Sequence, residues 1–246
     1  MCHNILLFAG SVTAAWKVPA WNHSSFANVM AVTMTRIKIC GITRREDALA
    51  AADAGADALG FIAVPGSPRY LDTQQFFDLA CWEPLPIFLQ TVVVVQKPGD
   101  EEEYCPDYVQ HYEDTPEASR ATGFAHTRIR AFRMRDESSL AEIAAYSDPV
   151  GAILLDTYHK DTLGGSGETF DWSLAVRAKA LTDRPLILSG GLTPGNVQAA
   201  LEAVRPYAVD VASGVEASPG VKDHAKVKAF VRAVREWDLA HHLEKC

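Results

Sequence analysis

The feature that most constrains the fold is an alternation of short apolar runs with helical patterns, which begins at Arg36 and repeats eight times. Alternating strands and helices are typical of parallel α/β sheets, and eight repeats over roughly 200 residues favour a (β/α)8 TIM barrel. A hydrophobic content of 48% in 246 residues suits one domain with a single sizeable core. The expected strands cover residues 36–40, 58–64, 89–96, 107–110, 126–134, 151–156, 185–192 and 208–216, the last two running into glycine turns.

Helical patterns follow most of these strands. They predict helices over residues 44–54, 73–81, 138–146 and 223–237, and a weaker one near 116–122. A further helix is expected after Trp172, and another from Thr193-Pro194, with the threonine as N-cap. The acidic run 100–103 is expected to be a solvated helix start.

The two ends of the chain differ from the rest. Residues 1–33 lack sustained periodicity, so we expect a poorly ordered extension or a segment that is not translated, with Met34 as the start. The apolar run 5–9 is too short to span a bilayer, and no Lys or Arg precedes it to make a signal peptide. The barrel is therefore assigned to residues 34–238 and a polar tail to 239–246.

Charge and cysteine usage exclude several classes of function. A formal net charge of -8 argues against nucleic-acid binding. The five cysteines form no CxxC pair, so neither a disulfide framework nor a zinc site is indicated, and a reducing cytoplasm is the simplest compartment. The histidines show no HxH or HExxH spacing, so we expect no metal.

Two strands end in residues that can transfer protons. Cys40 closes the first strand and Asp156 the sixth, so both are expected at the same mouth of the barrel, as a base and acid pair. Either residue alone would be weak evidence, because free cysteines are often inert core residues and strand-end aspartates often stabilise loops. A thiol with a pKa of about 8.5 needs activation. Lys38 on the same strand face could supply it, or Asp210 on the last strand could neutralise Lys38 instead.

Two further features indicate an anionic ligand. Gly190 and Gly191 follow the seventh strand, and Ser213 and Gly214 follow the eighth, where barrels of this class usually bind phosphate. The alternative is a pair of ordinary tight turns. Arg69 lies in a loop interrupted by two prolines, where it could meet an anionic substrate or simply be solvated.

Taken together in order and spacing, these motifs resemble the phosphoribosylanthranilate isomerase family of tryptophan biosynthesis over about residues 34–234. The matching segments are Lys38-Ile39-Cys40-Gly41-Ile42-Thr43, Gly60-Phe61, Ser67-Pro68-Arg69-Tyr70, Leu154-Leu155-Asp156, Gly164-Gly165-Ser166-Gly167, Phe170-Asp171-Trp172, Leu188-Ser189-Gly190-Gly191-Leu192, Val209-Asp210-Val211 and Ser213-Gly214-Val215-Glu216.

The resemblance implies a cofactor-free Amadori rearrangement of N-(5-phosphoribosyl)anthranilate. The expected partner is a phosphorylated small-molecule substrate, and the expected assembly is a monomer or a homodimer. The resemblance further implies that Asp156 is the general acid, Cys40 the general base, and Arg69 the ligand of the anthranilate carboxylate. The glycine loop 164–167 would close over the substrate. By the same carry-over the phosphate is held by Gly190, Gly191, Ser213 and Gly214.

One segment departs from the family pattern. Where the family usually shows Val-Gln-Leu-His-Gly-Glu, residues 109–114 place Tyr112-Glu113 at the usual His-Gly, and residues 130–133 are unusually basic. The departure leaves two alternatives open. One is a related isomerase for another phosphoribosyl amine, and the other is a non-catalytic phosphate-binding paralogue.

Overall fold

The computed structural model describes residues 34–80, 85–86, 88–101, 103–113, 127–158 and 169–243. The chain divides after Thr33, and the unit Met34–Cys246 is considered below. Three predictions lie outside the described residues: the extension 1–33, the helix near 116–122 and the glycine loop 164–167.

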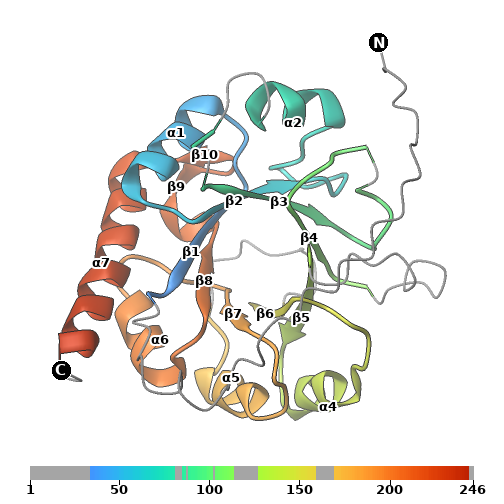
Figure 1. The fold of residues 1–246 in the computed structure, drawn as a ribbon, viewed down its shortest axis with the longest axis vertical. Helices are drawn as coiled ribbons and strands as arrows, with labels where there is room; N and C mark the ends of the chain where they lie inside the picture. The colour runs from blue at the N-terminus through green and yellow to red at the C-terminus, as the bar shows by residue number, and fades with distance from the viewer. Residues whose placement is uncertain are drawn as a thin grey trace, which may run out of the picture. The chain divides into compact units, whose positions relative to one another are not determined.

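Eight parallel strands close into a barrel in sequence order, which confirms the predicted fold class (Figure 1). Closure occurs where β1 pairs with β8, in a register that places Lys38 beside Asp210. The strands are β1 (Arg36–Cys40), β2 (Ala58–Ile62), β3 (Gln90–Val95), β4 (Tyr108–His111), β5 (Arg128–Met134), β6 (Ala152–Thr157), β7 (Leu186–Leu188) and β8 (Ala208–Val211).

Side chains alternate between two cores because successive strand residues point to opposite faces. One cluster, which includes Ile129, Ala131 and Leu154, has the inward parity of Asp156. The larger cluster lies between strands and helices and contains Ile37, Ile39 and Phe230, all fully buried. Inward positions near the C-terminal strand ends carry polar side chains, so the barrel changes from apolar to polar toward that mouth.

The helices lie outside the strands (Figure 1). Their boundaries follow local chemistry: Asp136 and Asp171 cap α4 and α5 by accepting from backbone N–H groups, and Gly55 ends α1 with a φ of 97°. The described helices are α1 (Arg45–Ala54), α2 (Thr73–Ala80), α4 (Glu137–Ala145), α5 (Trp172–Lys179), α6 (Val197–Val204) and α7 (His224–Leu243).

Three local predictions were wrong. Helix α6 begins at Val197 rather than at Thr193, because the Thr193 carbonyl accepts from Asn196 and Val197 within a preceding turn. Helix α7 continues to Leu243, past the expected end at 237, because Asp238 is buried against the start of β1 and accepts from Thr35. The described residues of the acidic run form turns.

Candidate active site

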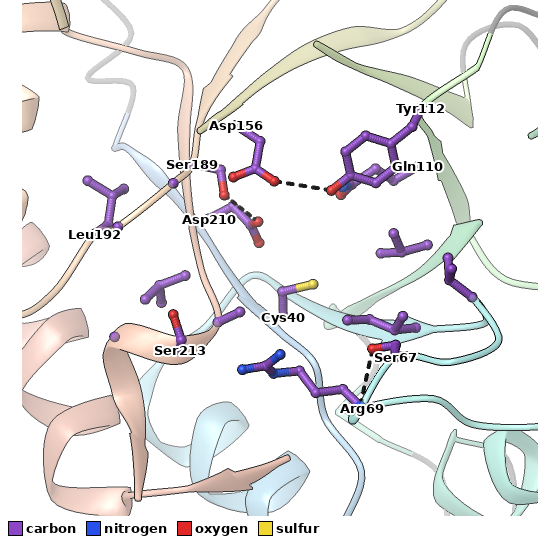
Figure 2. A pocket seen from close by; sticks show the side chains of 18 residues that line it. Cys40, Ser67, Arg69, Gln110, Tyr112, Asp156, Ser189, Leu192, Asp210 and Ser213 are labelled. Carbon is purple, nitrogen blue, oxygen red and sulfur yellow. Dashed lines mark hydrogen bonds between the residues drawn. The ribbon is translucent and has the colours of Figure 1, made fainter. Parts of the chain in front are cut away.

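A pocket opens at the C-terminal ends of the strands and collects every predicted site residue (Figure 2). These residues come from the C-terminal ends of five strands or from the loops after them, so the barrel brings them together. The predicted residues that line the pocket are Cys40, Arg69, Asp156, Gly190, Gly191, Ser213 and Gly214.

A buried ion pair crosses the floor of this pocket. Lys38 Nζ donates to Asp210 Oδ1 at 2.8 Å and to Gln110 Oε1 at 3.0 Å, and Ser189 donates to Asp210 Oδ2 at 2.9 Å. Burial opposes the charge of Lys38, but attraction to Asp210 prevails and raises the lysine pKa. Of the two roles considered for Lys38, pairing with Asp210 is therefore the one that the geometry shows.

Cys40 lies at the end of β1 with 6% of its surface exposed. Burial raises the pKa of its thiol and the Asp210 charge adds to this effect, while Lys38 and Lys222 act in the opposite direction. The lysines therefore favour a thiolate without outweighing burial. Activation of the thiol depends on what enters the pocket.

Asp156 closes β6 and is also 6% exposed. Burial and the charge of Asp210 raise its pKa from 3.8 to about 6, against hydrogen bonds from the Thr157 N–H and the Tyr112 hydroxyl. These donors lie 2.9 Å from Oδ1 and 3.2 Å from Oδ2. A carboxyl with a pKa near neutrality can give up a proton at physiological pH.

Arg69 is held by a carboxylate that the sequence did not identify as a partner. Its Nε and Nη2 donate to the two oxygens of Glu216 at 2.8 and 2.6 Å, and Lys222 donates to the same carboxylate at 2.9 Å. Although burial opposes ionisation of Glu216, Arg69 and Lys222 hold its pKa below the usual range. The bidentate pair fixes the guanidinium plane at the pocket wall.

The two turns after β7 and β8 have no room for a side chain. Gly190 has a φ of 86°, and a Cβ there would lie 2.2 Å from Thr157 Oγ1. At Gly214 a Cβ would lie 1.9 Å from the Leu192 carbonyl oxygen. The main chain itself therefore forms this side of the pocket, as a phosphate cradle requires.

Metal and membrane functions find no counterpart among the described residues. No group of three or more His, Cys, Asp or Glu side chains there could hold a metal ion, and none of the described helices has the length and hydropathy to cross a membrane. The absence of a metal and of a cofactor stays a prediction.

Comparison with known proteins now decides the family. The model of the N-(5′-phosphoribosyl)anthranilate (PRA) isomerase family matches residues 37–233. The chain belongs to this family. It is 47% identical to the isomerase of Geobacter sulfurreducens over 211 residues, which are 83% of this chain and 100% of the relative. It is 44% identical to the isomerase of Pseudomonas fluorescens Pf0-1 over 210 residues, with coverage of 83% and 100%.

Solved PRA isomerases have the same barrel. The crystal structure of the Thermotoga maritima enzyme superposes with a TM-score of 0.73 at 38% identity, covering 82% of this chain and 100% of that one. A second PRA isomerase structure, solved in complex with reduced 1-(o-carboxyphenylamino)-1-deoxyribulose 5-phosphate, superposes with a TM-score of 0.70 at 35% identity and the same coverage.

Several residues of this PRA isomerase pocket were missed as functional from the sequence alone. Glu216 was matched only as part of a motif, and Lys222 was not singled out, yet Glu216 accepts from both Arg69 and Lys222. Tyr112 was identified only as a departure from the family pattern, but its hydroxyl contacts Asp156. Tyr112 comes two residues after Gln110 of β4, so both side chains point into the barrel, and this spacing could have identified Tyr112 as a pocket residue.

Proposed function

We propose that this protein catalyses the Amadori rearrangement of N-(5-phosphoribosyl)anthranilate to 1-(2-carboxyphenylamino)-1-deoxyribulose 5-phosphate, a step of tryptophan biosynthesis. The observation that carries the proposal is the presence of Cys40 and Asp156 in one pocket whose far wall is the glycine main chain. The activity for which the family is named and the reduced product bound by a solved relative agree with it.

Asp156 acts first, as general acid. Its carboxyl proton passes to the furanose ring oxygen while the bond from that oxygen to C1′ breaks. The lone pair of the anthranilate nitrogen forms the C=N bond of an iminium ion. The raised pKa of Asp156, caused by burial and by the charge of Asp210, supports this role because the carboxyl retains its proton closer to neutral pH.

Cys40 then acts as general base. Its thiolate takes the proton from C2′, and the electrons of that C–H bond form C1′=C2′ while the iminium nitrogen regains its lone pair. The resulting enol becomes the ketone when a proton is added at C1′ and the C2′ hydroxyl loses its proton as its O–H electrons form the C=O bond. The reaction requires a proton on Asp156 and none on Cys40; Lys38 and Lys222 favour the thiolate by their charge, although burial raises the pKa of the thiol.

The ends of the substrate are assigned to opposite walls. We assign the phosphate to Gly190, Gly191, Ser213 and Gly214, which line the pocket in the turns after β7 and β8. Arg69 is assigned to the anthranilate carboxylate. Glu216 accepts from Nε and Nη2 of Arg69, so we assign the substrate carboxylate to Nη1.

The cellular setting is also a proposal. A base that works as a thiolate must stay reduced, so we place the enzyme in the cytoplasm. Cys40 and Cys105 are free thiols. We propose a monomer or a homodimer, since a T. maritima relative is named as dimeric.

The test is turnover of freshly generated phosphoribosylanthranilate, followed by the loss of its fluorescence. The full chain should convert the substrate, and Cys40→Ser and Asp156→Asn should each lose roughly 10²–10⁴-fold in kcat. A folded wild-type protein that binds the product analogue without turnover would indicate the non-catalytic paralogue. Conversion of a different phosphoribosyl amine would indicate the related isomerase.

A further inference from the structure

Tyr112 follows β4 at the mouth of the barrel and points its hydroxyl at the carboxyl of Asp156 (Figure 2). The hydroxyl oxygen lies 3.2 Å from Asp156 Oδ2, while Oδ1 accepts from the Thr157 N–H at 2.9 Å. Among the described residues, each carboxylate oxygen therefore accepts from one of these two donors. The backbone donor of Thr157 is independent of side-chain identity, so Tyr112 is the donor that sequence change can alter.

The ring of Tyr112 is held in place by its surroundings. The backbone N–H of Tyr112 donates to the Gln96 carbonyl at 3.1 Å, and the backbone carbonyl of Tyr112 accepts from Arg130 Nη1 at 2.6 Å. The guanidinium of Arg133 lies over the ring, 5.0 Å from the centroid. Arg133 is on β5 and pairs in register with Asp156 on β6, so the stacked arginine and the carboxyl belong to adjacent strands.

We propose that Tyr112 is a positioning residue for the proton transfer from Asp156, in the place where the family pattern has a histidine. Its hydroxyl fixes the orientation of the carboxyl and stabilises the carboxylate as the proton leaves. The inference rests on the proposed function, in which Asp156 is the general acid.

The physical reason is that the hydrogen bond strengthens as the reaction proceeds. Before transfer, Tyr112 donates to a neutral carboxyl, and after it to a carboxylate, which is a charge-assisted bond. An interaction that is stronger in the transition state than in the ground state raises kcat. Burial and the charge of Asp156 raise the pKa of Tyr112 well above its usual value, so the phenol keeps its proton and remains a donor.

Other groups around Asp156 also set its charge. Asp210 on β8 raises the pKa of Asp156 and Lys38 on β1 lowers it, and Arg133 on β5 is the neighbour of Asp156 in strand register. Because a Tyr112→Phe substitution leaves all of them in place, a change in the titration of Asp156 reports the loss of one hydroxyl.

The experiment compares full-length wild type with Tyr112→Phe and Tyr112→His. The matched control is Tyr108→Phe at the start of β4. We measure kcat and KM against pH and follow the carboxyl of Asp156 by ¹³C NMR titration. Tyr112→Phe should lower kcat roughly ten- to a hundredfold with little change in KM. It should also raise the pKa of Asp156, because a donor to the ionised form is lost.

Tyr112→His should recover a large part of kcat, because an imidazole N–H can replace the donor, and Tyr108→Phe should match wild type. A Tyr112→Phe enzyme with wild-type kcat would overturn the proposal. So would a loss of kcat with unchanged titration of Asp156 and no recovery by histidine. If the wild type itself does not turn over, the proposed function fails, and the NMR titration still shows whether Tyr112 controls the carboxyl.

Discussion

Replacing Asp156 with asparagine should stabilise the fold even though it removes the proposed general acid. The carboxyl is buried, and its pKa rises from 3.8 to about 6, first because of burial and then because of Asp210. An increase of this size corresponds to about 3 kcal/mol of unfavourable free energy for the ionised form, at about 1.4 kcal/mol per pKa unit. A neutral amide does not carry this cost.

The sign follows from proton linkage. Between the unfolded and folded pKa values the native protein binds more protons than the unfolded chain, so raising the pH across this window destabilises the fold. The cost is nearly absent at about pH 4 and complete above about pH 7. The amide also keeps both hydrogen-bond partners, because its oxygen can accept from Thr157 and its NH2 can donate to the Tyr112 oxygen.

Urea unfolding of wild type and Asp156→Asn at about pH 4 and about pH 8 provides the assay, since the difference between the two proteins removes the titration of every other group. We expect the advantage of Asp156→Asn in free energy of unfolding to be larger at the higher pH by about 2–3 kcal/mol. An equal difference in free energy of unfolding between the two proteins at both pH values would refute the argument that ionisation of this buried carboxyl destabilises the fold.

Two further predictions concern the walls of the pocket. Gly214→Ala should raise KM at least tenfold, because a Cβ 1.9 Å from the Leu192 carbonyl oxygen must displace the turn. Gly195→Ala, where the atom nearest to the new Cβ is 3.8 Å away, should leave KM unchanged. Steady-state kinetics of both variants checks this. Lys38→Met should cost about 3–5 kcal/mol in urea unfolding because it strands the charge of Asp210. The double variant with Asp210→Asn should recover most of that loss, and additive costs would contradict the pairing.

The sequence predicted the barrel and its mouth well because both depend on local patterns. Parallel strands place all their C-terminal ends at one side, so the positions of Cys40 and Asp156 at strand ends were enough to bring them together. The prediction of Thr193 as the N-cap was wrong because residues 193–196 form a turn before the helix, in which the Thr193 N–H donates to the Asn196 side chain.

What could not be predicted depends on contacts between distant residues. Arg69 and Glu216 are 147 positions apart, and no local pattern indicates which carboxylate will hold the guanidinium. The partner of Lys38 was similarly open, since inward parity allowed both Cys40 and Asp210. Only the register of β1 against β8, which sets Lys38 beside Asp210, decides between them.

That register also explains how two aspartates in one pocket acquire different chemistry. Asp210 accepts from both Lys38 and Ser189, at 2.8 and 2.9 Å. Asp156 accepts from the neutral donors Thr157 N–H and Tyr112 hydroxyl, and its pKa rises because of burial and the negative charge of Asp210. Asp210 therefore acts on the proposed proton transfer indirectly, because its charge raises the pKa of Asp156, while the charge of Lys38 acts on that pKa in the opposite direction.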